Sequence, residues 1–273
     1  MVKKLFKHEF LAYARVMSVV YIILLTIALA GRVILLFEND SIPYQIISTI
    51  SIITYVFSVW AVMVFAVVMG IIRFYKHLFT SEGYLTFTLP VTPTQHIVVK
   101  TVTALCIEMI TFAVILLSGC VLTAGELLVE IWNVVVYIFG EFYELVGFHA
   151  VAFLGELLLL YLLQCVAGIL LYYTYICIGQ LFRKARILAA VGAYFAHYIL
   201  SQIVASVISV MFSLVAITDA LKELMQWLGD LVVAHPYATV HSGLWIAMLA
   251  PVTTILVTFL VVRTIITKKL NLE

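Results

Sequence analysis

Six apolar runs, each long enough to cross a lipid bilayer, constrain this chain more than any other feature. A membrane-spanning helix needs about 20 mostly apolar residues. Runs of this kind occur at residues 16–37, 46–72, 101–123, 150–178, 187–217 and 244–266. Several of them exceed one bilayer crossing, so we expect helix tilt or helical extension into water. The pattern predicts an all-α integral membrane protein with six transmembrane helices in one domain, residues 1–273.

The composition excludes a soluble protein. Of the 273 residues, 65% are hydrophobic and 11% are charged. A soluble domain has roughly 45–50% apolar and about 25% charged residues. A chain of this length cannot hide so much apolar surface in its own core, so lipid must be its solvent. We therefore exclude a soluble enzyme.

The charged residues predict the orientation of the spans. Lys and Arg concentrate in the cytoplasmic loops of membrane proteins. With a cytoplasmic N-terminus, six spans return the C-terminus to the cytoplasm and place 13 of the 15 Lys and Arg residues on that side; only Arg32 and Lys222 fall outside. The opposite side then carries mostly Asp and Glu. We expect a multi-pass membrane protein with both termini in the cytoplasm.

Residues 1–15 have a pattern of their own. Apolar and aromatic residues alternate there at helical spacing with Lys3, Lys4, Lys7 and Arg15. This pattern is typical of a basic amphipathic helix on the inner leaflet. Two interpretations stay open: an elbow helix that braces the first span, or an ordinary basic flank that sets the topology.

Two further amphipathic segments are predicted on the outer side. In residues 126–148, apolar residues and glutamates each recur every three or four residues, which gives one helix an apolar face and an acidic face. Four carboxylates argue against a lipid-exposed span, because each is costly in hydrocarbon. This segment is therefore expected on the outer surface, or as extensions of the third and fourth helices. A shorter helix follows the fifth span between Asp219 and Asp230, with a break at His235-Pro236.

The segment between the second and third spans has two boundary signals. Glycine favours a helix C-cap, so the second helix should stop near Gly83. Thr92-Pro93-Thr94-Gln95 has a capping-box residue at both ends and proline in the first turn, so the third helix should start at Thr92. Residues 81–91 therefore form a short separate segment on the cytoplasmic side.

Four large apolar or aromatic side chains lie within six residues of this segment: Tyr84, Leu85, Phe87 and Leu89. Water should not be the only neighbour of such a cluster. Lipid headgroups or a second protein must cover it, and the residues alone leave both alternatives open.

This region resembles a known family. Residues 82–91, Glu-Gly-Tyr-Leu-Thr-Phe-Thr-Leu-Pro-Val, followed by Thr92-Pro93-Thr94-Gln95, are similar to the first cytoplasmic loop of bacterial ABC type-2 transporter permeases. The tail, residues 268–273, is also similar to tails in that group. The layout of elbow helix, six spans, first inner loop and outer helices before the last span agrees with the family over the full chain.

The resemblance implies a role in ATP-driven transport across a bacterial cell membrane. It does not identify the substrate, since substrate does not follow from fold. Such permeases pair with a cytoplasmic ABC ATP-binding subunit, and two permeases, identical or different, form one pathway. The short helix of the first inner loop is the coupling helix, which lies in a groove of the ATPase. The corresponding residues here are Glu82, Gly83, Tyr84, Leu85, Phe87 and Leu89.

The motifs that are absent from the sequence agree with this division of roles. No G-x-x-x-x-G-K-[ST] phosphate loop occurs, so ATP hydrolysis is expected in a partner subunit and not in this chain. The four cysteines all lie in apolar runs and form no C-x-x-C pair, so we expect neither metal nor another cofactor. No catalytic residue is predicted.

Several polar and small residues inside the spans are candidates for the pathway or for helix packing. Glu108 is a candidate because an intramembrane carboxylate is costly; the alternative is a hydrogen-bonded partner of a neighbouring helix, such as Gln164 or His197. Gly192 and Ala196 form a small-x-x-x-small pair, which permits close helix contact between two permeases or within one.

The leading hypothesis is the permease subunit of an ABC exporter. Its main rival is a non-transporting membrane protein, such as a sensor or an immunity protein. An intramembrane enzyme is disfavoured, because the sequence has no H-E-x-x-H motif and no paired intramembrane Asp.

Overall fold

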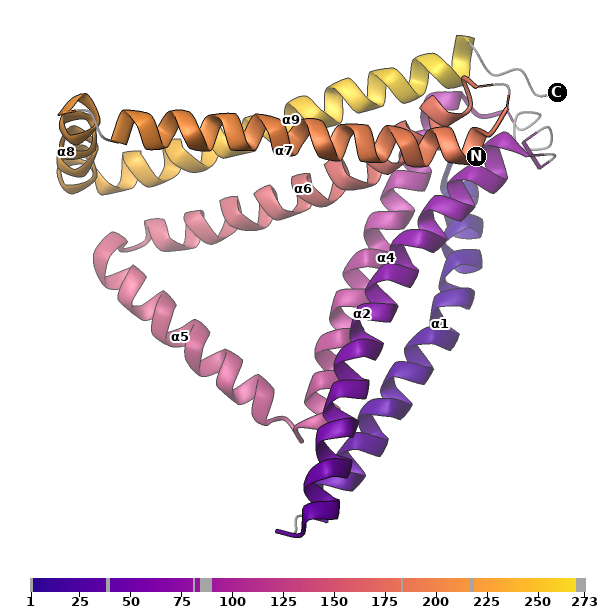
Figure 1. The fold of residues 1–273 in the computed structure, drawn as a ribbon, viewed down its shortest axis with the longest axis horizontal. Helices are drawn as coiled ribbons and strands as arrows, with labels where there is room; N and C mark the ends of the chain where they lie inside the picture. Colours follow the sequence, from indigo (N-terminus) through magenta and orange to yellow (C-terminus); the bar gives the residue numbers. More distant parts are fainter. Residues whose placement is uncertain are drawn as a thin grey trace. The chain divides into compact units, whose positions relative to one another are not determined.

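The chain is all-helical. The computed structural model describes residues 2–37, 40–80, 82–83, 90–182, 184–216 and 219–268, and Figure 1 shows the helices that they form. The helices are α1 Val2–Leu35, α2 Ile42–Phe79, α4 Pro93–Leu122, α5 Glu126–Val146, α6 His149–Gly179, α7 Arg186–Ala216, α8 Asp219–Ala234 and α9 Pro236–Lys268. The predicted all-α class is confirmed.

Six helices are long and apolar enough to cross a membrane. Among the described residues these are α1, α2, α4, α6, α9 and the stretch Arg186–Met211 of α7. Each coincides with one of the six predicted spans. The prediction of a multi-pass membrane protein with six spanning helices is therefore confirmed by helix length and composition.

The N-terminal segment differs from the expected separate elbow. Residues 2–15 continue into the first span as one helix, α1, without a break. The physical reason is local, since residues 10–20 contain neither glycine nor proline to interrupt the helix. The boundary predicted at residue 15 is wrong, and the bracing role of this segment stays a prediction.

Helix boundaries around residues 80–92 agree with the sequence at one end only. Thr92 caps α4, and the Gln95 side chain accepts a hydrogen bond from the Thr92 backbone, so the predicted capping box is confirmed. However, α2 ends at Phe79, and not near Gly83. There the backbone of Thr80 is extended, and its hydroxyl donates a hydrogen bond to the Lys76 carbonyl.

The break at His235-Pro236 is confirmed, since α8 ends at Ala234 and α9 begins at Pro236.

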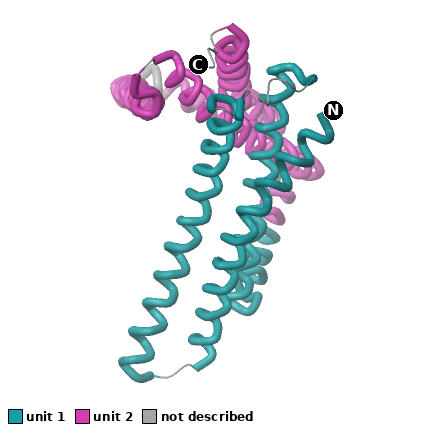
Figure 2. The backbone as a smooth tube through the Cα atoms, turned by 90° about the vertical axis from the view of Figure 1, so that its right-hand side faces the viewer, with its two compact units in different colours: residues 1–138, 272–273 teal, residues 139–271 magenta. Residues whose placement is uncertain are grey.

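The contacts divide the chain into two compact units, residues 1–138 and residues 139–271 (Figure 2). The single permease domain expected for residues 1–273 stays a prediction. In unit 1, helices α1, α2 and α4 contact one another pairwise. Their core contains Tyr13, Met17, Ala66 and Ile107. The Tyr13 hydroxyl donates a hydrogen bond to the Ala66 carbonyl, which ties α1 to α2.

Polar side chains also join the helices of unit 1 farther along their length. The Tyr21 hydroxyl lies 2.6 Å from Thr111 Oγ1 and the Tyr55 hydroxyl 2.9 Å from Ser118 Oγ. These pairs link α1 to α4 and α2 to α4. In lipid the hydrophobic effect does not drive helices together, because lipid tails are as apolar as the side chains. Interhelical hydrogen bonds of this kind therefore contribute to helix association there.

In unit 2, α6 contacts both α7 and α9, and α8 contacts α7 and α9. A Cβ added to Gly179 would lie 2.7 Å from the Cβ of Ala190, so the start of α7 packs closely on the end of α6. Glu156 of α6 accepts a hydrogen bond from the Trp245 indole (3.2 Å) and lies 2.8 Å from His241 Nδ1 of α9. This polar contact joins α6 to α9.

The orientation of the spans can be tested by cysteine labelling. We expect a cysteine introduced by Glu130→Cys to react with a membrane-impermeant maleimide in intact cells, and one introduced by Lys184→Cys to react only after permeabilisation. The reason is the concentration of Lys and Arg on one side of the six spans. The four native cysteines would be replaced by serine as background. Labelling of position 184 in intact cells would contradict the orientation.

Candidate functional site

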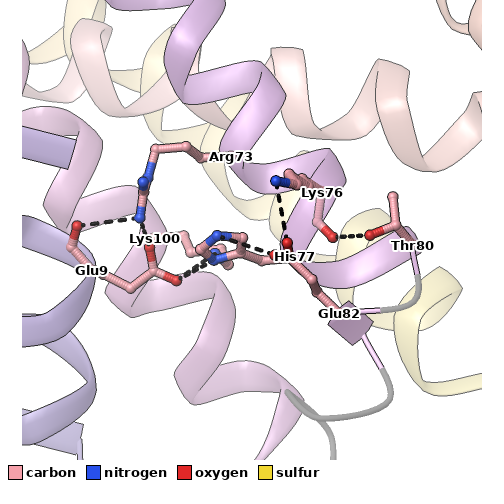
Figure 3. A network of polar contacts seen from close by, with 7 residues as sticks. All are labelled: Glu9, Arg73, Lys76, His77, Thr80, Glu82 and Lys100. Carbon is pink, nitrogen blue, oxygen red and sulfur yellow. Dashed lines mark hydrogen bonds and ion pairs between the residues drawn. The ribbon is translucent and has the colours of Figure 1, made fainter. Parts of the chain in front are cut away.

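A buried carboxylate lies at the junction of three helices in unit 1. Glu9 of α1 faces Arg73 and His77 of α2 and Lys100 of α4 (Figure 3). We call these four residues the Glu9 network. Arg73 and His77 lie in the last turns of α2, which precedes the segment 81–91, and Lys100 lies about two turns after the start of α4, which follows it.

Both carboxylate oxygens of Glu9 have partners. The Lys100 ammonium donates to Oε1 at 2.7 Å, and His77 Nδ1 lies 2.9 Å from the same oxygen. Arg73 Nη2 donates to Oε2 at 2.9 Å. The Glu9 carboxylate thus accepts hydrogen bonds from cationic side chains of two other helices.

The network is shielded from solvent. The Glu9 side chain is 11% exposed and that of Lys100 is 5% exposed. Removal of such charges from water is costly, and their attraction offsets the cost only when the geometry and the additional hydrogen bonds are good. The Arg73 guanidinium also lies 5.5 Å from the centroid of the Tyr13 ring, a cation–π distance. The network therefore holds the ends of α1, α2 and α4 in one arrangement.

A second, more exposed carboxylate connects the network to the segment 81–91. Glu82 Oε1 lies 3.2 Å from Lys76 Nζ, and Glu82 Oε2 lies 3.6 Å from His77 Nε2. The two nitrogens of the His77 ring thus face two carboxylates, Glu9 on one side and Glu82 on the other. Figure 3 shows this line of side chains from the buried carboxylate to the beginning of the segment.

Local sequence places these side chains. Arg73 and His77 are four residues apart on α2 and therefore share one helix face. The capping box at Thr92 fixes the start of α4, and Lys100 follows two helical turns later on the face that meets α1. Glu9 lies three residues after Phe6 and four before Tyr13, on the side of α1 that faces the core.

Sequence reasoning missed the Glu9 network. It used Arg73 and Lys100 only as topology signals and assigned no role to Glu9 or His77. One signal was available, because Glu9 is the only acidic residue in the basic segment 1–15 and shares the face of Phe6 and Tyr13. An acidic residue on an apolar helix face predicts a buried cationic partner.

The predicted coupling residues are described only in part. Glu82 and Gly83 have helical backbone, and Gly83 donates a backbone hydrogen bond to the Thr80 carbonyl at 2.8 Å. Tyr84, Leu85, Phe87 and Leu89 lie outside the described residues. Their role as a coupling segment stays a prediction.

The intramembrane candidates are distributed over both units. Glu108 is half-buried on α4 in unit 1, whereas Gln164 and His197 belong to unit 2. His197 Nδ1 lies 2.9 Å from the Tyr175 hydroxyl, which links α7 to α6. Gly192 and Ala196 are exposed, and a Cβ added to Gly192 would meet no atom within 4 Å. Within unit 2 the close contact of α7 uses Ala190 instead.

No group of three or more His, Cys, Asp or Glu side chains that could hold a metal ion is present in the part of the chain that the structure describes. The four cysteines are free thiols, and Cys177 is buried. The arrangement around Glu9 therefore offers electrostatic attraction between helices α1, α2 and α4.

Comparison with known proteins gives no relative. No family model matches the chain, and neither a curated protein nor a solved structure matches it.

Proposed function

We propose that this chain is the transmembrane permease subunit of an ATP-driven ABC transporter of the exporter type. It would form the substrate pathway with a second permease, identical or different, and would be powered by a separate cytoplasmic ATP-binding subunit. The observation that carries the proposal is the sequence 82–91 with the helix cap that follows it, which resembles the coupling loop of ABC type-2 permeases.

The Glu9 network supports this proposal by mechanical reasoning. A segment that transmits movement from an ATPase to membrane spans must be attached firmly to those spans. The segment 81–91 begins at the end of α2 and is followed by α4, and both helices are held by the same buried carboxylate of α1. A displacement of the segment would therefore act on three spanning helices together.

Glu82 supplies the direct connection. It is the first predicted coupling residue, and it pairs with Lys76 and lies close to His77, which in turn contacts Glu9. Exposed pairs of this kind contribute at most about 1 kcal/mol, so this contact can open and reform during a transport cycle. The buried Glu9 contacts are the more durable part.

Copurification tests the proposal. We expect the tagged chain, extracted from its native membrane in mild detergent, to bring with it a protein that contains a phosphate-binding loop, and we expect the complex to hydrolyse ATP. The chain alone should show no ATPase activity, because its sequence has no such loop. ATP turnover by the purified chain without a partner would refute the assignment.

The rival function makes a different prediction in the same experiment. A sensor or immunity protein would be recovered without a phosphate-loop protein. Depletion of the proteins that copurify with it would then leave ATP turnover in the membrane unchanged. Recovery of the chain alone from membranes, under conditions in which a known ABC complex stays intact, would favour that rival.

A further inference from the structure

Helix α5 separates its charged and apolar side chains almost completely. An α-helix turns by about 100° per residue, and at this rotation all four glutamates, Asn133 and Tyr137 fall within roughly a quarter of its circumference. The remaining circumference is apolar apart from Gly140. Within residues 126–144 it consists of Leu127, Leu128, Val129, Ile131, Trp132, Val134, Val135, Val136, Ile138, Phe139, Phe142 and Tyr143.

In the part of the chain that the structure describes, the apolar side of α5 is exposed. None of the residues 126–144 is buried, and Trp132, Ile138 and Val129 are exposed by 67%, 61% and 60%. Two close contacts of α5 lie near its ends. A Cβ on Gly119 of α4 would lie 2.7 Å from Leu127, and the rings of Phe142 and Phe153 are 4.7 Å apart. The apolar side between these ends needs another neighbour.

Both ends of α5 are sharp turns. Ala124 and Gly125 have φ values of 53° and 89°, and Gly147 has a φ of 61°. These left-handed conformations, which glycine adopts readily, end α4 and α5, so α5 is not a continuation of either adjoining helix. Helices α4 and α6, to which it is joined, are each long and apolar enough to span the membrane. Helix α5 therefore begins at a membrane surface, at the end of α4 that is remote from Lys100.

Charge decides which neighbour fits. Helix α5 carries four carboxylates and no Lys or Arg. A bilayer crossing would place several carboxylates in hydrocarbon, which is costly, and the negative charge disfavours anionic surfaces. A helix in the plane of a zwitterionic bilayer surface avoids both costs, because its apolar side enters the acyl-chain boundary, its charged side stays in water, and the surface has no net negative charge.

We propose that α5 is an interfacial membrane-binding helix that lies flat on a zwitterionic lipid surface, with Val135 on its lipid side and Glu130 on its water side. In the orientation proposed above this surface is the outer leaflet. Apolar contact is the sole attraction, since α5 has no basic residue to pair with lipid phosphates. The proposal requires six spanning helices and is independent of transport.

Spin labels on the two sides of α5 test this placement. The full chain, with its native cysteines replaced by serine, would carry a nitroxide after Val135→Cys or Ile131→Cys on the apolar side, and after Glu130→Cys or Tyr137→Cys on the polar side. In phosphatidylcholine vesicles, the ratio of collisions with oxygen to collisions with a water-soluble nickel chelate should be at least about threefold higher on the apolar side, because oxygen concentrates in lipid.

Three results would overturn the proposal. Equal ratios at all four positions would place α5 in water. If the ratio rises toward the centre of the helix, falls toward both of its ends and does not differ between the two sides, α5 is a membrane span. Exclusion of both reagents from the apolar side, with magnetic broadening between labels, would mean that a second copy of the chain covers it.

A measurement that keeps the native cysteines guards against a variant that does not fold. In vesicles of phosphatidylcholine brominated near the top of its acyl chains, part of the tryptophan fluorescence should be quenched. The quenched portion should fall with Trp132→Phe. Trp132→Phe with Tyr137→Trp moves the indole to the polar side and should not restore the quenching. Unchanged quenching in Trp132→Phe, or restoration in the double variant, would contradict the placement.

Discussion

Replacement of Glu9 by glutamine should lower the free energy of unfolding of the protein by about 3–5 kcal/mol, the usual effect of removing one partner from a buried ion pair. Glutamine keeps the shape of the side chain, but it removes the negative charge that lies in contact with Lys100 and Arg73. Lys100 is 5% exposed and has little access to water. The measurement is equilibrium unfolding of the purified chain in mixed micelles with increasing dodecyl sulfate.

Two variants make this test specific. Glu82→Gln removes a carboxylate that is 44% exposed and also faces His77, so its effect should stay below about 1 kcal/mol. In the double variant Glu9→Gln, Lys100→Met, the buried cation is removed as well, and part of the lost stability should return. If Glu9→Gln costs no more than Glu82→Gln, the Glu9 network does not hold these helices together.

The second large effect concerns the segment 81–91. If an ATPase groove buries its apolar cluster, Phe87→Ala should weaken the complex by about 1–3 kcal/mol, as at other interface hot spots. Leu85→Glu should weaken it more, because the new carboxylate would be buried without a partner. Membrane insertion should survive both changes, since residues 81–91 lie outside the six spanning helices.

Recovery of the ATP-binding subunit in pull-downs, together with ATP turnover of the complex, measures this effect. Thr86→Ser is a matched control, because it changes the same segment without altering an apolar anchor. Lipid coverage of the cluster predicts normal ATPase recovery with a small loss of membrane anchoring. Wild-type recovery and turnover for both Phe87→Ala and Leu85→Glu would remove the main link between this sequence and transport.

The sequence was sufficient for the fold class and for most helix boundaries. Each spanning helix is encoded by a local apolar run, and lipid imposes helical structure because it offers no hydrogen-bond partners to the backbone. The start of α4 was also predictable, since Thr92, Pro93 and Gln95 act within one turn. The end of α2 was not, because Gly83 was assigned a capping role that the chain does not use.

The candidate site depended on contacts between distant residues. Glu9 and Lys100 are separated by 91 positions, and nothing in the local pattern of either residue identifies the other. The sequence by itself determined six membrane-spanning helices, the asymmetric charge distribution and the amphipathic pattern of α5, because these properties follow from local composition and periodicity. Only the tertiary structure decided that one acidic residue in a basic segment pairs with side chains of two other helices, because burial and pairing of a charge depend on which helices meet.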